Sequence, residues 1–367
     1  MRTIQPRALR SRRLLALPVV TIAVLAGAVA CGSSSGGSSG SGTVSQQTGT
    51  AKVLRLGYFP NITHATALIG VEKGFFAQKL GSTTLKTQTF NAGPAETEAL
   101  LSGALDAGYI GPNPAINAFA KSHGAAIRII AGAASGGVQF VVRAGITKPA
   151  DLAGKKIATP QLGNTQDVAL RAWLKSKGFT PSSASTPGDV KVEPTDNATT
   201  LQLFKQGKID GAWVPEPWAS RLVIEGGGHV LVDEKTLWPA GKFVITHLIV
   251  RTEFLKKYPE PVKELLEGQV ATTDWVEKNP ADAKQEANAA LAKLTGKPLK
   301  SAVLDRAWSN IVLTNDPVAS SLKKSAADAV TAGLLKETDL KGIYDLTLLR
   351  QVLSAQGGGT VDDAGLG

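Results

Sequence analysis

The chain has 367 residues, of which 43% are hydrophobic and 19% charged, and a formal net charge of +10. Five Arg residues lie within the first 31 positions; without them, 35 basic residues stand against 30 acidic ones, a net charge of +5. The remaining basic residues are scattered along the chain, which argues against nucleic-acid binding. About 315 residues follow the N-terminal segments, too many for one hydrophobic core, so two lobes are expected.

The N-terminal segment predicts export and membrane anchoring. A basic head precedes an apolar run of 17 residues, Leu14 to Ala30, which stops at Cys31, the single cysteine of the chain. "AGAVAC" followed by "GSSSGGSSGSG" resembles a bacterial lipoprotein signal, in which Cys31 is lipidated and becomes the mature N-terminus. A transmembrane helix needs about 20 apolar residues, and a Gly/Ser tract cannot bury a thiol, so these alternatives are weaker. We expect a signal peptide over residues 1–31, a flexible linker over 32–51, and a protein anchored outside the cytoplasm.

Two stretches 104 residues apart then repeat one pattern. "LLSGALDAGYIGPNPA" begins at Leu100 and "FKQGKIDGAWVPEPWA" begins at Phe204. Each predicts a helix ended by Gly, a turn containing Asp, a short buried strand and a Pro-containing loop. Segments upstream of both match in the same order, which favours a true repeat over chance similarity. The chain is therefore predicted to contain β-loop-α-β-loop-α-β twice.

Strands that alternate with helices predict parallel sheets covered on both faces, and hence an α/β fold with two Rossmann-like lobes. After Val250 the pattern becomes helical, and this part is expected to pack back onto the first lobe. The chain would cross between lobes near residues 138–145 and 246–252, which predicts two hinge strands and a ligand cleft between the lobes. The expected boundaries are 52–140 and 247–350 for lobe 1, 141–246 for lobe 2, and 351–367 for a C-terminal tail.

Three polar loops carry the candidate site: "PNITH" at 60–64, "GPNPA" at 111–115 and "QLGNT" at 161–165. In parallel α/β sheets, ligands bind beyond the carboxyl ends of the strands, and each of these loops opens a predicted helix. A helix N-terminus carries unpaired N–H groups and roughly half a positive charge. The loops are therefore expected to bind an anion.

None of these loops contains Lys or Arg, which predicts a singly charged anion with several acceptor oxygens. A phosphate dianion would more often attract Arg, whereas sulfonate, nitrate and bicarbonate suit such a site. Sulfonate leads because Tyr58, Phe59, Trp213 and Trp218 could line a pocket for an organic tail.

Each of these features also has a purely structural interpretation. Asn164 and Thr165 could be an ordinary N-cap pair, and Trp213 and Trp218 could be core residues. Glu216 is an unexpected neighbour, because a carboxylate at the rim of an anion site repels the ligand.

Glu216 therefore has two interpretations. It could pair with Arg221 or Arg143 in a structural role, which we favour, or it could recognise an ammonium group on the ligand.

Taken together, the lipoprotein N-terminus, "LRLGYFPNITHATALIGVEKGFF", "GALDAGYIGPNPAI", "KKIATPQLGNTQD" and "IDGAWVPEPWA" resemble ABC-transporter substrate-binding proteins of the nitrate/sulfonate/bicarbonate group, which includes aliphatic-sulfonate and taurine binders. The resemblance implies a periplasmic-binding-protein-like fold that closes over its solute and acts as a monomer. It also implies delivery to a membrane permease driven by an ATPase. By motif position, the ligand-binding residues would be Asn61, Thr63, His64, Gly111, Asn113, Pro114, Gly163, Asn164, Thr165, Glu216 and Trp218.

The leading hypothesis is thus a solute-binding lipoprotein that captures a sulfonate-like anion, without catalytic residues, metal or cofactor. Within this class, nitrate, bicarbonate or a thiamine-precursor-like heterocycle are alternative ligands. An enzyme on the same fold is a rival, but the four His residues have no metal-ligand spacing and the Ser residues have no visible base. A lipoprotein that senses a solute without transporting it is a third possibility.

Overall fold

A computed structural model describes residues 50–182 and 186–367, which belong to one unit, Gln47–Gly367. The predicted signal peptide, the predicted lipidation site Cys31 and nearly all of the predicted linker lie outside the described residues. Ala51 is already buried, and its carbonyl accepts a hydrogen bond from Thr83 Oγ1 at 2.8 Å. No helix within the described ranges combines the length and apolar character needed to cross a bilayer.

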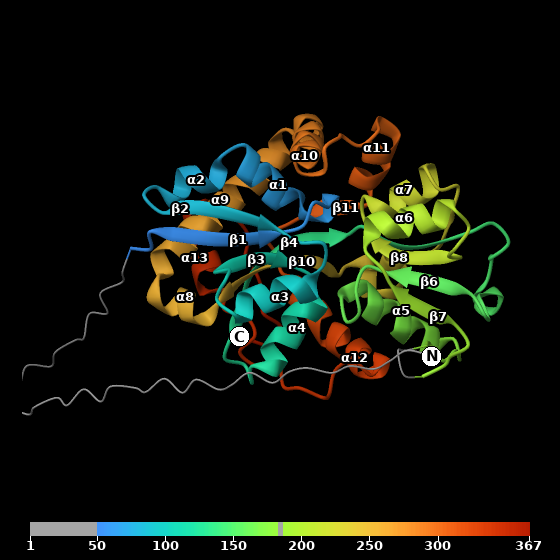
Figure 1. The fold of residues 1–367 in the computed structure, drawn as a ribbon. Helices are drawn as coiled ribbons and strands as arrows, with labels where there is room; N and C mark the ends of the chain where they lie inside the picture. Colours follow the sequence, from blue (N-terminus) through green and yellow to red (C-terminus); the bar gives the residue numbers. More distant parts are fainter. Residues whose placement is uncertain (1–49, 183–185) are drawn as a thin grey trace, which may run out of the picture. The chain divides into compact units, whose positions relative to one another are not determined.

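The strands form two sheets (Figure 1). The first has the order β11-β4-β10-β3-β1-β2 and the second the order β7-β6-β8-β5-β9. Strands of the first sheet are β1 (Val53–Tyr58), β2 (Thr84–Thr89), β3 (Ala107–Ile110), β4 (Ile127–Gly136), β10 (Val244–Arg251) and β11 (Ile311–Leu313). Strands of the second sheet are β5 (Val138–Val142), β6 (Lys156–Thr159), β7 (Lys191–Pro194), β8 (Gly211–Pro215) and β9 (His229–Asp233).

The repeat predicted from the sequence is confirmed by the strand order. β2-β1-β3 and β7-β6-β8 are equivalent parallel trios. In each, an aspartate before the third strand binds the first strand: Asp106 accepts from the Arg55 N–H at 2.9 Å, and Asp210 from the Lys156 N–H at 2.8 Å. The glycines that follow α3 and α6 have φ of +77° and +76°, a conformation that favours glycine.

The prediction of parallel sheets holds for these trios and is wrong for the strands beside them. β10 runs antiparallel to both β3 and β4, and β5 runs antiparallel to both β8 and β9. The physical reason is the exchange of strands between lobes. The chain enters β5 from the first sheet and β10 from the second, so each inserts in the opposite direction to the strands of its new sheet.

These two exchanged strands coincide with the predicted hinge strands. The chain leaves the first sheet at Gly136 and Gly137, whose φ values of +77° and +72° suit glycine, and it returns through residues 234–243, before β10 begins. The predicted boundary at residues 140–141 thus falls within β5, which pairs along its whole length with the second sheet.

Helices cover the sheets and extend beyond them. Those between the strands of the repeats are α1 (Ala65–Glu72), α2 (Phe75–Leu80), α3 (Gly93–Leu101), α4 (Pro112–Lys121), α5 (Thr165–Ser176), α6 (Asn197–Lys205) and α7 (Trp218–Ile224), with 3-10 turns η1 (Ile62–His64), η2 (Pro149–Leu152), η3 (Glu234–Leu237) and η4 (Pro239–Gly241). The C-terminal part contains α8 (Thr252–Lys257), α9 (Pro259–Lys278), α10 (Pro280–Thr295), α11 (Ser301–Ser309), η5 (Ala319–Ser321), α12 (Leu322–Ala332) and α13 (Thr347–Ala355).

The C-terminal helices pack against the first lobe, as predicted. The apolar face of α9, which includes Val262, Leu265 and Leu266, is fully buried in the same core as β1, β3 and β10. Two helices of this part also reach the second lobe, since α11 contacts α7 and α12 contacts α5. The predicted tail at 351–367 is folded: α13 extends to Ala355, and the Leu366 carbonyl accepts from the Gly342 N–H at 2.9 Å.

Candidate functional site

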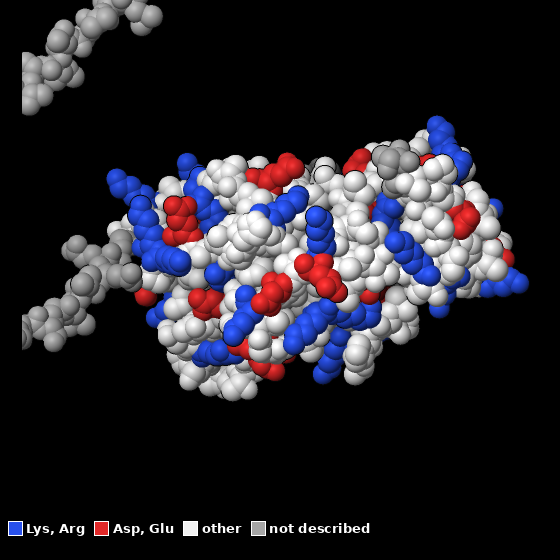
Figure 2. All heavy atoms as spheres, turned by 90° about the horizontal axis from the view of Figure 1, so that it is seen from below, with Lys and Arg blue, Asp and Glu red and all other residues white. Residues whose placement is uncertain are grey.

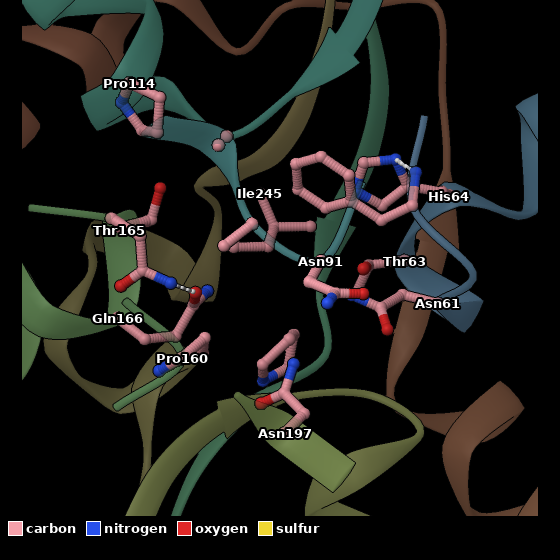
Figure 3. Close-up of a pocket in the computed structure, with 16 residues that line it drawn as sticks. Asn61, Thr63, His64, Asn91, Pro114, Pro160, Thr165, Gln166, Asn197 and Ile245 are labelled. Atoms are coloured by element: carbon pink, nitrogen blue, oxygen red, sulfur yellow. Dashed lines mark hydrogen bonds between the residues drawn. The ribbon is translucent and has the colours of Figure 1, made fainter. Parts of the chain in front are cut away.

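A small cavity lies where the strands of both repeats end (Figure 3). Its walls include the residues that follow β1, β2, β3 and β6 and the last residue of β8, namely Phe59, Asn91, Gly111, Pro160 and Pro215. The carboxyl ends of parallel strands lie at one edge of a sheet, and here these edges of both sheets border the same space. About 30 Å³ is open to the centre of a water molecule, which corresponds to about two water molecules.

Five helical segments begin at this cavity. The lining contains the first or capping residues of η1 with α1, and of α3, α4, α5 and α6, namely Asn61, Gly93, Gly111, Asn164 and Asn197. The caps of α3 and α4 are Ala92 and Gly111, which have no side-chain acceptor for the N–H groups of the first turn. The cavity therefore receives several partial positive charges and contains no full one.

The cavity lining, as far as the structure describes it, contains no Lys, Arg, Asp or Glu. The charged residues nearest to the start of α5 neutralise each other: Arg171 Nε donates to Asp167 at 3.0 Å, and both side chains are buried. Asp167 also accepts from Thr159 Oγ1 at 2.9 Å and from the Gly163 N–H at 3.0 Å. The carboxylate of Asp167, in the first turn of α5, is thus fully engaged by partners from its own lobe.

His64 contributes a neutral donor. Burial lowers the pKa of His64 to about 3, so the ring is uncharged at physiological pH. Its Nδ1 accepts from the Phe59 N–H at 3.3 Å, and the two rings pack with their centroids 4.3 Å apart. Because Nδ1 is an acceptor, the proton lies on Nε2.

Two buried polar atoms of the lining have no hydrogen-bond partner: Thr165 Oγ1 and Asn197 Oδ1. Unpaired buried polar atoms are costly, about 1–3 kcal/mol each, so a polar ligand would stabilise both. Rotation of the Asn197 amide would offer its NH₂ group instead. In Figure 3, Thr165 lies across the cavity from Asn61, Thr63 and His64.

The two lobes approach each other closely at this point. A Cβ atom added to Gly111 would lie 2.4 Å from Thr165 Oγ1. Trp218 Nε1, on α7, donates to Asn61 Oδ1 at 2.9 Å. Both contacts join residues of the first repeat to residues of the second, so the cavity is formed jointly by the lobes.

A second cluster joins the lobes beside the cavity, around the buried Glu216. Its carboxylate accepts from Ser220 Oγ at 2.9 Å, from Asn310 Nδ2 at 2.7 Å and from Arg306 Nη1 at 3.1 Å. Burial raises the pKa of Glu216, and the bonds from Asn310, Ser220 and Arg306 oppose that rise. Arg306 also donates to Gln139 Oε1 at 2.6 Å. Glu216 thus connects the loop after β8 to α11.

The Arg partner expected for Glu216 was wrong. Arg221 pairs with Glu225, one turn along α7, and Arg143 Nε donates to the Ile209 carbonyl. The actual partner, Arg306, is 90 residues further along the chain.

Comparison with known proteins places this arrangement in a family. The model of the NMT1-like family matches residues 47–293. The chain belongs to the NMT1-like family. The taurine-binding periplasmic protein of Escherichia coli K12 is 30% identical over 225 residues, which cover 61% of this chain and 67% of that protein.

Solved structures agree on the two-lobed fold. The alkanesulfonate-binding protein SsuA of Xanthomonas axonopodis pv. citri matches with a TM-score of 0.64 and 22% identity, covering 79% of this chain and 96% of SsuA. The nitrate-binding protein NrtA of Synechocystis PCC 6803 matches with a TM-score of 0.69 and 17% identity, covering 83% and 89%.

In this NMT1-like protein, seven of the eleven predicted ligand-binding residues line the cavity: Asn61, Thr63, His64, Gly111, Pro114, Asn164 and Thr165. Four do not. Asn113 Nδ2 donates to the Ser325 carbonyl, and the Gly163 N–H donates to Asp167. Glu216 belongs to the separate cluster described above. Trp218 does not line the cavity, but its Nε1 donates to Asn61, which does. Ligand contact by any of the eleven residues stays a prediction.

Of the aromatic residues proposed to contact an organic tail, some line the cavity and others do not. Phe59 lines the cavity. Trp213 is fully buried in the second lobe, where Nε1 donates to Glu234 Oε2 at 2.6 Å and the ring stacks on Phe140. Trp213 is therefore a core residue of the second lobe and does not line the cavity.

Sequence reasoning missed three polar residues of the lining, Asn91, Gln166 and Asn197. Two of them lie in the loops after equivalent strands, Asn91 after β2 and Asn197 after β7, but they do not occupy equivalent positions of the repeat. No local signal identifies Gln166, whose side chain is positioned by a bond from Asn164 Nδ2 at 3.1 Å.

The Glu216 cluster predicts non-additive mutational effects. Arg306→Met leaves a buried carboxylate without its cation and should lower the free energy of unfolding by about 2 kcal/mol, less than for a fully buried pair because Arg306 is partly exposed. In Glu216→Gln/Arg306→Met, much of this loss should be recovered. Urea unfolding measures both, with Arg350→Met, which breaks the exposed pair with Asp363, as the matched control. Strictly additive losses would contradict a coupled pair.

The lowered pKa of His64 predicts that the free energy of unfolding decreases at acidic pH. Between pH 6.5 and about 3 the unfolded chain binds a proton at this side chain that the folded protein does not, so stability falls as pH falls through this window. At about 1.4 kcal/mol per pKa unit, His64→Gln should reduce the loss of stability between pH 6.5 and pH 4 by about 3 kcal/mol. Denaturant unfolding at several pH values tests this. The exposed His123→Gln should keep the wild-type slope, and an unchanged slope in His64→Gln would refute the assignment.

Proposed function

We propose that this protein is the extracytoplasmic solute-binding component of an ABC importer, and that it captures a small organic oxyanion resembling an aliphatic sulfonate or taurine. The observation that carries the proposal is the buried, uncharged cavity at which five helical segments begin. The taurine-binding relative and the alkanesulfonate-binding structural neighbour support this ligand class.

The energetics favour a single negative charge. A partly buried helix N-terminus contributes up to about 2 kcal/mol to binding an anion, and a hydrogen bond to a charged acceptor contributes about 1.5–3 kcal/mol. Several such donors hold a monoanion without a full countercharge. A dianion would leave one charge uncompensated in a buried space, at high cost.

The lining also suits an organic tail. Phe59, Pro114, Pro215 and Ile245 give apolar surface among the polar groups, as expected for a pocket that binds both a charged head and a short hydrocarbon. This mixture favours a sulfonate over an inorganic ion.

Nitrate and bicarbonate are the second candidates, and the small size of the cavity favours them. A cavity with room for about two water molecules accommodates a planar monoanion more readily than a sulfonate with its alkyl chain. The nitrate-binding neighbour is consistent with this alternative.

We further propose that the protein performs no chemistry on its ligand. The imidazole of the cavity, His64, is bonded to the backbone of Phe59 and is neutral, and its Nδ1 is not available as a base. The Thr63 hydroxyl has no activating base among the described hydrogen bonds, and Thr165 Oγ1 is unpartnered. An activated nucleophile needs an adjacent base or a lowered pKa.

The proposal includes a lipid anchor at Cys31, a monomeric state and delivery of the solute to a membrane permease. The resemblance of the N-terminus to a lipoprotein signal supports the anchor, and the family of binding proteins supports the partner.

A ligand screen with one cavity variant tests the function. Calorimetry on residues 32–367 would compare taurine, alkanesulfonates, nitrate, bicarbonate and a neutral pyrimidine. Thr165→Val keeps the shape of the side chain and removes the unpartnered hydroxyl, so the affinity for the true ligand should fall about 10- to 100-fold. Thr199→Val, an exposed position on α6, is the control and should leave the affinity unchanged. Binding of the pyrimidine alone, or equal affinity in Thr165→Val, would reject the anion cavity.

A further inference from the structure

A basic groove lies at the opposite edge of the first sheet from the cavity. It is lined by residues at the amino ends of β1 and β2, the last residue of β10, and α8. Five of its side chains are basic and two are acidic, a net charge of +3: Lys52, Arg55, Lys86, Arg251 and Lys257 against Asp106 and Glu253. Lys and Arg side chains are dense at the left-hand end of the face in Figure 2, the end at which β1 begins in Figure 1.

The two arginines of the groove are already paired. Arg55 binds Asp106 at 2.7 Å, and Arg251 binds Glu253 at 2.9 Å. Lys52, Lys86 and Lys257 are exposed, and within the described ranges none of them has a carboxylate within 4.0 Å. Three ammonium groups are therefore available to an external anionic partner.

The chemistry of the groove suits a surface better than a single ion. Its available cations are flexible Lys side chains, which act as point charges and do not form a rigid fork. The two arginines, which could bind one phosphate in a bidentate manner, are engaged by carboxylates. A diffuse array of negative charge is the partner that such lysines match.

The position of the groove in the chain points to the same partner. Ala51 and Lys52, which begin the folded part, themselves line the groove. The Cys31 proposed to carry the lipid precedes Lys52 by about 20 residues. If these residues form the flexible linker predicted from the sequence, its root-mean-square span would be about 25 Å. A lipid at Cys31 would therefore hold this groove close to the membrane surface.

We propose that the groove formed around Lys52, Lys86 and Lys257 docks on anionic phospholipid headgroups of the membrane that carries the anchor. This rests on the lipid anchor and is independent of which solute the cavity binds. The cavity lies at the far end of β1, about 20 Å away for a six-residue strand. A docked molecule thus turns the solute-binding edge away from the lipid, and it must leave this position to bring that edge to a permease.

Vesicle co-sedimentation tests the docking. Residues 32–367 lack the lipid-bearing cysteine and keep the whole folded unit, whose core is contained within it. This protein should bind vesicles of phosphatidylglycerol and phosphatidylcholine at low salt, should be released at about 0.5 M salt, and should not bind phosphatidylcholine alone. The triple variant Lys52→Glu/Lys86→Glu/Lys257→Glu should bind the anionic vesicles about 100-fold more weakly, the order expected for three lost basic contacts.

A charge-matched control separates the groove from net charge. Lys191→Glu/Lys205→Glu/Lys208→Glu changes three exposed lysines of the second lobe by the same total charge, and it should retain most of the binding. Both triple variants should keep wild-type solute affinity, so failure here is distinct from failure of the cavity assignment. Equal loss in both variants, binding to phosphatidylcholine alone, or no binding by the wild-type protein would overturn the proposal.

Discussion

The structure is organised around the burial of helix N-termini in a space without formal charge. Five helical segments start at the cavity. The caps of α3 and α4, Ala92 and Gly111, have no side-chain acceptor for the first N–H groups, whereas Asn164 and Asp196 each accept one hydrogen bond from the first turn of α5 and α6. Partial charges from several helices can stabilise one negative charge while each remains bonded within its own helix. A lysine in the same place would need its own desolvation and a fixed partner.

The titratable groups around the cavity preserve this neutrality. His64 is uncharged because burial lowers its pKa. Glu96, in the first turn of α3, is fully buried with both carboxyl oxygens unpartnered, and burial raises its pKa well above the usual value. It is packed against Gly57 and Gly108, where any Cβ atom would collide with Oε1. Burial thus favours the neutral form of Glu96, which adds no negative charge beside the site.

Two kinds of contact hold the lobes around this space. The exchanged strands β5 and β10 make each sheet depend on a strand that arrives from the other lobe. Side-chain contacts then complete the junction: Trp218 with Asn61, and Glu216 with Arg306 and Asn310. Arg306 lies on α11 and Asn310 directly follows it, so the C-terminal part helps to hold the lobes together, although none of its residues lines the cavity.

The order of amino acids alone was sufficient to predict the repeat, the α/β class, the helical C-terminal part and seven residues of the cavity lining. These features depend on patterns a few residues long: a glycine that ends a helix, an aspartate before a strand, an Asn-Thr pair at a helix start. Folding in three dimensions decided the rest. Arg306 meets Glu216 across 90 residues, Asn91 and Asn197 converge because two sheets share an edge, and β5 and β10 reverse direction because they change lobes. Such pairings arise from packing between distant segments, and no local pattern encodes which segments will meet.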